Sequence, residues 1–337
     1  MKKGLELAYA VGDVSQYSPP STARLGLRPP VKAVTVTVPA TSANLGAGFD
    51  VFGLALRLYN TFNVSETAGA GGITINGAAR SEGISTGADN LFYRSFAALC
   101  VRAGRSVPTV NIHMNIEIPP GRGLGSSATA VVGGLLAANR WLGEPFSRED
   151  LLPTAIEFEA GNHPDNVAPA LLGGLVVCAG SKEQPQAIKV PFPSDLKAVL
   201  FIPTFEMDTV RGRGLMPGQY ATGDVVFSTG RVALFLAALQ SRDYSRLQTA
   251  MQDRLHQPYR TALFPAMPDI IAAALAAGAV GASLSGGGST ILALANRRHD
   301  VIASSMSKAA AESRVEGSSR ILNIAVGGAK VIAERAA

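Results

Sequence analysis

The sequence predicts an α+β fold in two halves. Segments with strand and helix periodicity are mixed along the chain, without the strict alternation that a doubly wound parallel sheet requires. The 337 residues are 47% apolar and 16% charged, which is enough apolar material to bury the cores of two domains. A proline cluster at 185–193 is typical of a linker. We therefore expect a flexible N-terminal arm at 1–30, an N-terminal domain at 31–190 and a C-terminal domain at 191–337.

The N-terminal arm is expected because two proline pairs, Pro19-Pro20 and Pro29-Pro30, bracket a stretch that contains Ser, Thr and Arg. Such a segment is typical of an extended or flexible terminus. Its composition indicates no function.

The N-terminal domain begins with a half-buried strand at 33–38, which alternates apolar and polar residues and is expected to end at Pro39. The clearest alternation is at 110–118 and places His113 on the polar face, so this histidine needs no catalytic role. Further strands are expected at 56–64, 73–75 and 176–178, and helices at 90–104, 126–142, 148–160 and 163–172.

The C-terminal domain is expected to open with a buried strand and to continue with helices. Two later strands flank a glycine turn, and a helix and a strand end the chain. The expected strands lie at 198–202, 280–285, 290–295 and 320–326, and the helices at 225–240, 243–256, 268–277 and 300–312.

Composition excludes several classes of protein. The net charge of +5 is scattered without a long basic run, which favours anionic small molecules over nucleic acid. No apolar run reaches the roughly 18 residues that a membrane span needs, and acidic residues interrupt the start of the chain, so we expect no membrane segment and no secretory signal. Cys100 and Cys178 lie in apolar contexts typical of buried free thiols, which favours a cytoplasmic protein.

The strongest motif is PPGRGLGSSA at 119–128, between an expected strand and an expected helix. Three glycines within five residues let backbone N–H groups turn toward one point, and the helix N-terminus adds further donors and a positive dipole. Together these features favour a polyphosphate site in which serine hydroxyls bind Mg²⁺ or phosphate. The loop lacks the Gly-Lys-[Ser/Thr] of a Walker A motif. The alternative is a glycine turn with Ser126 or Ser127 as the helix N-cap.

Two other loops also contain clustered glycines. Three consecutive glycines, Gly286 to Gly288, exceed what a hairpin needs and favour a backbone that approaches a ligand or the first loop; a flexible turn is the alternative. The segment PATSANLGAGFD at 39–50 offers Asn44 and Asp50 to hydroxyl and ammonium groups, although local Asx turns also explain both residues.

Two charged segments complete the candidate site. Residues 157–169 contain two glutamates, an imidazole, an aspartate and an amide; a carboxylate here suits Mg²⁺, and a solvated helix end is the alternative. One histidine without cysteines does not match a zinc site. The segments TVRGRGLMP at 209–217 and HQPYR at 256–260 contain arginines in loops bounded by Gly or Pro, which suits bidentate recognition of a carboxylate.

In combination these motifs resemble a known superfamily. PATSANLGAGFD, PPGRGLGSSATA, HPDNVAPALLGG and SLSGGGST, in this order, resemble the GHMP kinases, and P-x-x-x-G-L-G-S-S-A is their phosphate motif. The first and third segments resemble homoserine kinases in particular. The resemblance extends from about residue 34 to the C-terminal strand. Gly287 and Ser289 stand where Ala and Pro are common in the family, which keeps the loop small and polar.

The resemblance implies two α+β halves, the first similar to the second domain of ribosomal protein S5. It implies ATP and Mg²⁺ as cofactors and L-homoserine as the substrate, which is phosphorylated to O-phospho-L-homoserine for threonine biosynthesis. Metal ligands would be Ser127 and Glu157, with Glu159 as the alternative acid. The ATP-binding residues would be Pro119, Pro120, Gly121, Arg122, Gly123, Leu124, Gly125, Ser126, Ser127, Gly286, Gly287 and Gly288. The residues around homoserine would be Asn44, Asp50, His163, Thr209, Arg213 and Arg260.

Asn166 stands where related mevalonate-type kinases carry a catalytic Asp, and an amide cannot act as a general base. We therefore expect catalysis by positioning and charge stabilisation, with Asp50, Asn166 and Ser127 as the catalytic residues. Two alternatives stay open: a GHMP kinase for another small alcohol such as mevalonate, and a non-catalytic nucleotide-binding regulatory protein. The arginine pair favours a substrate with a carboxylate, and the base rate of closed assemblies favours a homodimer.

Overall fold

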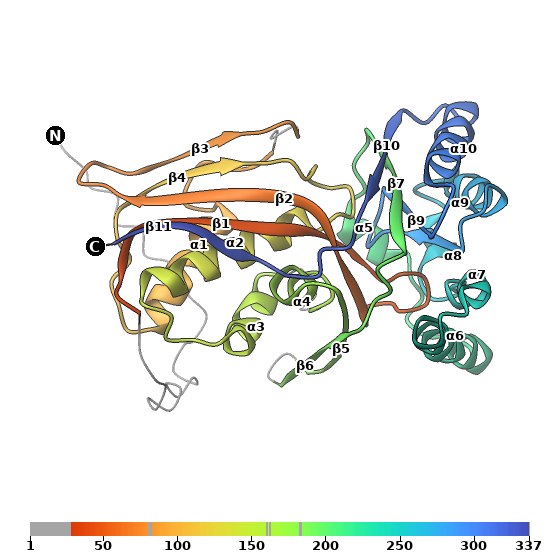
Figure 1. The fold of residues 1–337 in the computed structure, drawn as a ribbon, viewed down its shortest axis with the longest axis horizontal. Helices are drawn as coiled ribbons and strands as arrows, with labels where there is room; N and C mark the ends of the chain where they lie inside the picture. Colours follow the sequence, from red (N-terminus) through yellow and green to blue (C-terminus); the bar gives the residue numbers. More distant parts are fainter. Residues whose placement is uncertain (1–27, 80–82, 160, 162, 182–183, 337) are drawn as a thin grey trace.

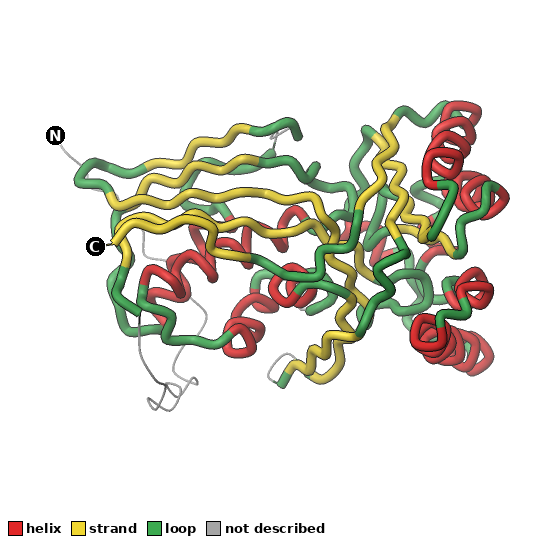
Figure 2. The backbone as a smooth tube through the Cα atoms, in the orientation of Figure 1, coloured by secondary structure: helices red, strands yellow, loops and turns green. Residues whose placement is uncertain are grey.

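Two β-sheets organise the fold, each covered by helices (Figures 1 and 2). The computed structural model describes residues 28–79, 83–159, 161, 163–181 and 184–336. The expected arm at 1–30 therefore lies outside the described residues except for its last three. Among the described residues strands and helices are mixed without strict βαβ alternation, which confirms the α+β prediction.

The first sheet has seven strands in the order β11-β1-β2-β4-β3, and β5 joins β2 and β6. Most pairs are antiparallel, and β3 and β4 are parallel. The last strand of the chain returns to this sheet beside β1 (Figure 1). The strands are β1 (Val31–Ala43), β2 (Phe52–Glu66), β3 (Gly72–Asn76), β4 (Val110–Asn115), β5 (Leu175–Gly180), β6 (Pro185–Val190) and β11 (Lys330–Ala336).

Four helices lie on one face of this sheet (Figure 1). The Asn90 side chain caps the first of them by accepting from two backbone N–H groups. Ser147 and Asp150 form a capping box at the third. Phe62 of the sheet and Phe92 stack at 4.7 Å within the core between the layers. The helices are α1 (Leu91–Arg102), α2 (Ser126–Trp141), α3 (Arg148–Glu157) and α4 (Val167–Leu172).

The second sheet has the strand order β10-β7-β9-β8, and every pair in it is antiparallel. Helices α9 and α10 pack on one face of it, while α6 and α7 share a core with side chains of β7, β9 and β2. The elements are β7 (Lys197–Pro203), β8 (Gly281–Leu284), β9 (Ile291–Ala295), β10 (Gly317–Leu322), α5 (Thr209–Gly214), α6 (Thr222–Ser241), η2 (Tyr244–Arg246), α7 (Leu247–Ala250), α8 (Gln257–Arg260), α9 (Met267–Ala276) and α10 (His299–Glu312).

One hydrophobic core joins the two halves. It combines Leu54 and Leu56 of β2 with Leu200 of β7, Leu292 of β9 and Phe235 of α6, all of them buried. A cavity at this junction therefore lies between two sheets whose side chains pack against each other. Close packing of this kind restricts movement of the cavity walls.

Most of the expected elements are found, and the exceptions have physical reasons. Pro39 does not end β1, because the register of β1 and β2 shifts beside it and accommodates the proline. Pro185 does not begin a linker; it is the first residue of an edge strand, where its missing N–H is tolerated. The expected helix at 243–256 is instead η2 and α7, and α5, α8, β6 and β11 were not predicted. The division at 190/191 remains a proposal, to which we add that residues 330–336 lie in the first sheet.

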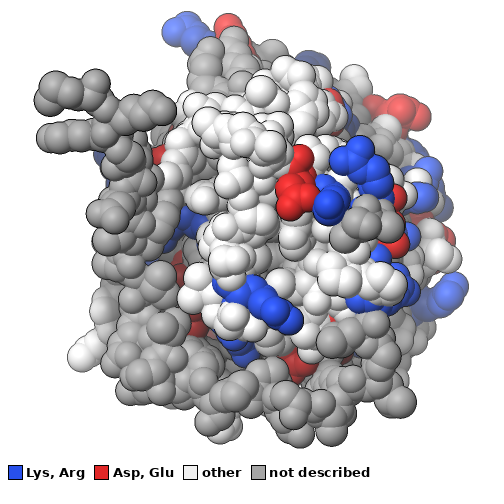
Figure 3. Space-filling model, turned by 90° about the vertical axis from the view of Figure 1, so that its left-hand side faces the viewer, with Lys and Arg blue, Asp and Glu red and all other residues white. Residues whose placement is uncertain are grey.

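On the face shown in Figure 3, acidic and basic side chains are interspersed, so the net positive charge is not gathered into one patch there.

Among the described residues one helix, α6, is long and apolar enough to cross a membrane by length and composition. Its Phe235 and Leu239 are buried in the core that joins the halves, whereas its Val225 and Val226 are exposed.

Candidate active site

A cavity of about 990 Å³ lies at the junction of the two halves. Its lining comes from seven separate stretches of the chain, which include the PATSANLGAGFD loop, the loop at 121–127, the segment that follows α3, α5 and the triple glycine. The sequence motifs are thus brought together around a single space.

The loop at 121–127 presents main-chain donors to this cavity. Gly123 and Gly125 adopt φ values of +71° and +67°, a region that L-residues with side chains rarely adopt. Gly125 is the N-cap of α2 and makes no side-chain capping bond. The alternative in which Ser126 or Ser127 caps this helix is therefore wrong, and the N–H groups of the first turn face the cavity with the positive end of the helix dipole.

The two serines of this loop differ. The Ser126 hydroxyl donates to the carbonyl oxygen of Ile118 at 3.0 Å, so it serves the loop itself. Ser127 is exposed and lines the cavity. Arg122 points away: its guanidinium is buried, pairs with Glu206 and donates to backbone carbonyls. Arg122 thus fastens the loop to the second half and does not line the cavity.

The triple glycine lies directly against this loop. Ser285 donates from its hydroxyl to the carbonyl oxygen of Gly123 at 2.6 Å, and the Thr290 N–H donates to the carbonyl oxygen of Arg122 at 3.1 Å. Gly286 and Gly287 line the cavity, whereas Gly288, Pro119 and Arg122 are not part of its lining. The interpretation of the triple glycine as a close approach to the first loop is confirmed by these contacts.

Charged side chains gather in another part of the cavity, which we call the acceptor end: Asp50, His163, Arg213 and Arg260. Arg213 donates two hydrogen bonds to the Asp50 carboxylate at 2.8 and 3.0 Å, and Nδ1 of His163 lies 3.4 Å from it. Burial lowers the pKa of His163, against the opposing effect of Asp50, so the imidazole is neutral near pH 7. The hydrogen bonds that Arg213 donates to Asp50 raise the pKa of Arg213.

Arg260 is buried, and its Nε has no hydrogen-bond partner among the described residues. A buried donor of this kind costs roughly 1–3 kcal/mol if it stays unpaired, so a bound anion would relieve a real deficit. Thr209, at the first position of α5, also lines the cavity.

Asn44 belongs to the cavity lining, yet its side chain is already engaged. Its Nδ2 donates to the carbonyl oxygen of Gly286 at 2.9 Å and its Oδ1 accepts from the Asp50 N–H at 3.1 Å. Asn44, Leu45 and Asp50 all have positive φ, and such strain persists only where the surroundings impose it. Asn44 therefore holds this loop against the triple glycine. Direct contact with substrate stays a prediction.

The two glutamates after α3 occupy different places. Glu157 is exposed and is not among the cavity-lining residues, whereas Glu159 lines the cavity. The Oε1 atom of Glu159 is buried without a hydrogen-bond partner among the described residues, and burial raises the pKa of this carboxyl to about 7. An unpaired carboxylate oxygen of a residue that lines the same cavity as a phosphate loop suits a hard cation. Glu159, the alternative acid, therefore fits a Mg²⁺ ligand better than Glu157.

Asp165 is the residue of this site that the sequence reasoning missed. It is buried in the cavity wall, and burial together with the nearby charges of Asp50 and Glu159 raises its pKa to about 8. Its neighbour Asn166 accepts a hydrogen bond from the Thr41 hydroxyl at 2.8 Å and so faces the phosphate loop. The alternation of polar residues in HPDN could have flagged Asp165, but burial of its carboxyl is set by the surrounding fold.

The cavity also extends beyond the phosphate loop toward the start of α1. Ile84, Met114 and Ile116 supply apolar surface there, and Ser85 and Asn90 supply polar groups. Such a mixture suits the flat base of a nucleotide. No motif marked this region in the sequence, because its residues come from ordinary strand and loop positions.

Comparisons with known proteins match both halves of the chain. The GHMP kinases N terminal domain family matches residues 90–174, and the GHMP kinases C terminal family matches residues 235–312. The homoserine kinase of Nostoc punctiforme is 42% identical over 301 residues, which cover 89% of this chain and 98% of that protein. The homoserine kinase of Persephonella marina is 40% identical over 87% of this chain and 96% of its own length.

Solved structures give the same grouping. The crystal structure of homoserine kinase from Cytophaga hutchinsonii has a TM-score of 0.81 and 31% identity, and the match covers 92% of this chain and 100% of that one. Mevalonate kinase from L. major, with a TM-score of 0.63 and 16% identity over 92% of this chain and 98% of that one, shares the fold alone. The GHMP kinase fold expected from the sequence is confirmed. The chain belongs to the homoserine kinase family of the GHMP kinases.

Proposed function

We propose that this protein transfers the γ-phosphoryl group of ATP to the hydroxyl of L-homoserine and produces O-phospho-L-homoserine for threonine biosynthesis. One observation carries the proposal: a single cavity is lined both by the glycine loop before α2, which we call the phosphate end, and by a cluster of arginine and carboxylate side chains. The relatives named homoserine kinase cover nearly the whole chain, which favours this acceptor over another small alcohol or a non-catalytic role.

At the phosphate end the chain acts through its backbone. The N–H groups at the start of α2 would hold the phosphates without any side-chain movement, because the loop is already fixed by Arg122 and Ser285. Preformed donors of this kind stabilise charge in a phosphoryl-transfer transition state at little reorganisation cost.

At the acceptor end, Arg260 and Arg213 would bind the α-carboxylate of homoserine, and Asp50 would meet its ammonium or hydroxyl group. Arg213 and Asp50 form an ion pair with each other. Bound homoserine would replace this pair by two ion pairs between substrate and protein, one through its carboxylate and one through its ammonium group. The neutral His163 beside Asp50 can donate one hydrogen bond and accept another, and Thr209 would complete the binding site.

Mg²⁺ bound with ATP would neutralise charge on the β- and γ-phosphates. The residues that fit it are Ser127 and Glu159, with Glu157 as the less favourable acid because it is exposed outside the cavity lining. Asn166 cannot take a proton, so its amide would orient groups near the transferred phosphoryl.

Cytoplasmic localisation and a homodimer are also proposed, from the two free thiols and from the base rate of closed assemblies.

The test is an ADP-release assay with MgATP and a panel of acceptors: L-homoserine, D-homoserine, L-threonine, mevalonate and no acceptor. Turnover confined to L-homoserine is the expected result. Turnover with mevalonate instead would keep a GHMP kinase and overturn the acceptor, and ATP binding without turnover on any acceptor would favour a regulatory protein.

A further inference from the structure

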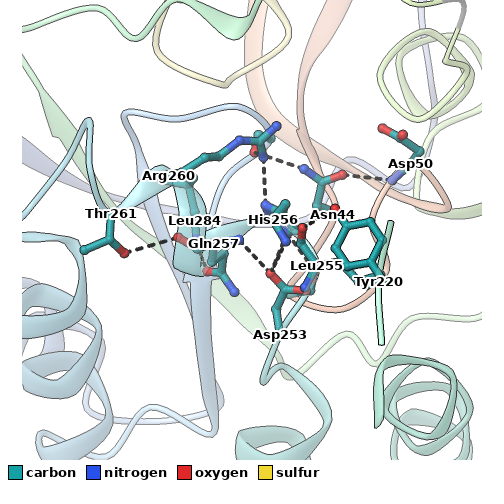
Figure 4. A network of polar contacts seen from close by, with 12 residues as sticks. Asn44, Asp50, Tyr220, Asp253, Leu255, His256, Gln257, Arg260, Thr261 and Leu284 are labelled. Carbon is teal, nitrogen blue, oxygen red and sulfur yellow. Dashed lines mark hydrogen bonds and ion pairs between the residues drawn. The ribbon is translucent and has the colours of Figure 1, made fainter. Parts of the chain in front are cut away.

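A buried polar network lies directly behind the acceptor end (Figure 4). At its centre is His256, a fully buried residue at the N-terminus of α8. Its Nδ1 lies 2.7 Å from Nη1 of Arg260, and its Nε2 lies 3.0 Å from the carbonyl oxygen of Gly46. His256 therefore connects the arginine of α8 to the loop that contains Asn44 and Asp50.

These two contacts determine which imidazole nitrogen carries the proton. A guanidinium can only donate, so Nδ1 of His256 must accept from Arg260. A carbonyl oxygen can only accept, so Nε2 must donate to Gly46. Burial lowers the pKa of His256 to about 4, which agrees with a neutral ring. The imidazole is thus fixed as the neutral Nε2–H tautomer.

Asp253 fixes the position of this imidazole. Its carboxylate accepts from the backbone N–H groups of Leu255, His256 and Gln257 at 2.8, 2.9 and 2.7 Å, and it lies 3.5 Å from Nε2 of His256. The Gln257 side chain in turn accepts from the Leu284 N–H at 2.7 Å and ties α8 to the end of β8. The histidine is therefore anchored on an element that cannot shift freely.

The same network reaches both arginines of the acceptor end. The Phe49 ring stacks on His256 with centroids 5.1 Å apart, and the guanidinium carbons of Arg213 and Arg260 lie 5.0 and 5.7 Å from its centroid. Nη1 of Arg260 also donates to the carbonyl oxygen of Gly286 at 3.1 Å. One nitrogen of Arg260 is thus used twice for anchoring, while its Nε stays without a partner among the described residues.

We propose that His256 is a positioning residue for the acceptor: its Nδ1 holds the guanidinium of Arg260 in the orientation that receives the substrate carboxylate. The inference rests on the proposed function in one respect, the assignment of Arg260 to that carboxylate. An arginine side chain without this contact would lose rotamer freedom on binding, and the histidine restricts that freedom beforehand.

The experiment compares two substitutions that each keep one imidazole contact. In His256→Asn the amide oxygen takes the place of Nδ1 and still accepts from Arg260, whereas in His256→Gln the longer amide reaches Gly46 and leaves Arg260 without its acceptor. We expect His256→Gln to raise KM for L-homoserine about tenfold or more, the loss typical of one hydrogen bond to a charged group, and His256→Asn to stay within about threefold of wild type. KM for ATP should change less than about twofold in both.

The control is His299→Gln, a substitution of a histidine on α10 outside the cavity lining, which should leave both KM values unchanged. Equal KM values for L-homoserine in wild type, His256→Asn and His256→Gln would overturn the proposal. A parallel rise in KM for both substrates would also overturn it, because that result indicates general loss of packing.

A second measurement needs no substrate. Long-range ¹H–¹⁵N spectra of histidine-labelled protein at pH 7 should show His256 as the Nε2–H tautomer, and its Nδ1 shift should move in Arg260→Leu. An Nδ1–H or doubly protonated ring, or an unmoved shift, would overturn the proposal. Failure of the wild type to phosphorylate L-homoserine would count against the proposed function alone, because the tautomer and its dependence on Arg260 are read without turnover.

Discussion

The two ends of the cavity are built from different parts of the polypeptide. At the phosphate end the recognition groups are backbone N–H donors, held by Gly123 and Gly125 in left-handed conformations and by the N-terminus of α2. At the acceptor end they are charged side chains that come from the loop after β1, the segment after α3, α5 and α8. We therefore propose that backbone donors recognise the phosphates and that charged side chains recognise the acceptor.

This difference has a consequence for mutational sensitivity. A backbone site tolerates no Cβ where the chain turns, but it is indifferent to the charge of its neighbours. A site built from side chains keeps its structure when one side chain is removed, but its affinity for the substrate that this side chain contacts falls. Substitutions at the two ends should therefore fail in different ways, and four predictions test this contrast.

The largest effect is expected for Gly123→Ala. The added Cβ would overlap the carbonyl oxygen of Ser285, and the positive φ of this residue adds strain. Because a displacement of ~1 Å costs on the order of 100-fold in rate, we expect kcat/KM for ATP to fall at least that far. Gly218→Ala, which meets open space, is the control. A Gly123→Ala enzyme with normal ATP kinetics would show that the loop is not a rigid backbone site.

Arg213→Ala should be next in size and confined to the acceptor. Removing the partner of Asp50 and one carboxylate donor should raise KM for L-homoserine roughly 30-fold, about 2 kcal/mol, with little change for ATP. Arg211→Ala is a matched control, since this exposed arginine lies on the same helix outside the cavity lining. An unchanged KM for L-homoserine would remove Arg213 from the acceptor end.

Glu159→Gln tests the boundary between the two ends. A direct Mg²⁺ ligand lost here should weaken the apparent Mg²⁺ affinity by roughly tenfold or more, while Glu157→Gln should leave it unchanged. Metal binding requires the carboxylate form of Glu159, and its pKa is about 7. The Mg²⁺ concentration needed for half-maximal activity of the wild type should therefore increase as pH falls from 8 to 6. In Glu159→Gln this concentration should no longer depend on pH. The reverse pattern, with only Glu157→Gln affected, would restore Glu157 as the ligand.

Asp165→Asn should give the smallest effect, a gain in stability. In the native state the pKa of the Asp165 carboxyl is about 8, whereas its ordinary value is 3.8. The stability that its protonated form contributes is therefore lost as pH rises from 3.8 to 8. The Tm difference between variant and wild type should therefore grow from pH 5 to 8, to roughly 2–4 °C, which corresponds to about 1 kcal/mol in a domain of 150–250 residues. The exposed Asp269→Asn is the control. A difference that is flat with pH would mean that Asp165 carries no ionisation cost.

The phosphate end was largely predictable from the sequence, and the acceptor end only in part. Gly123, Gly125 and Ser127 follow one another, so local spacing was enough to predict a phosphate loop before α2. The spacing also suggested Ser126 as a cap, and the uncapped start of α2 corrects this. Arg122, counted with the loop, turns instead to Glu206, a contact between residues 84 positions apart.

The sequence by itself determined the α+β class, most helices and strands, and the motifs of the phosphate end, because glycine turns, capping residues and apolar periodicity act over a few neighbouring residues. Only the tertiary structure decided that Glu159 and not Glu157 lines the cavity, that Asp165 is buried beside Asp50, and that His256 lies behind Arg260. Burial and pairing of charge depend on segments far apart in the chain, and their free energies arise only when the two halves pack together.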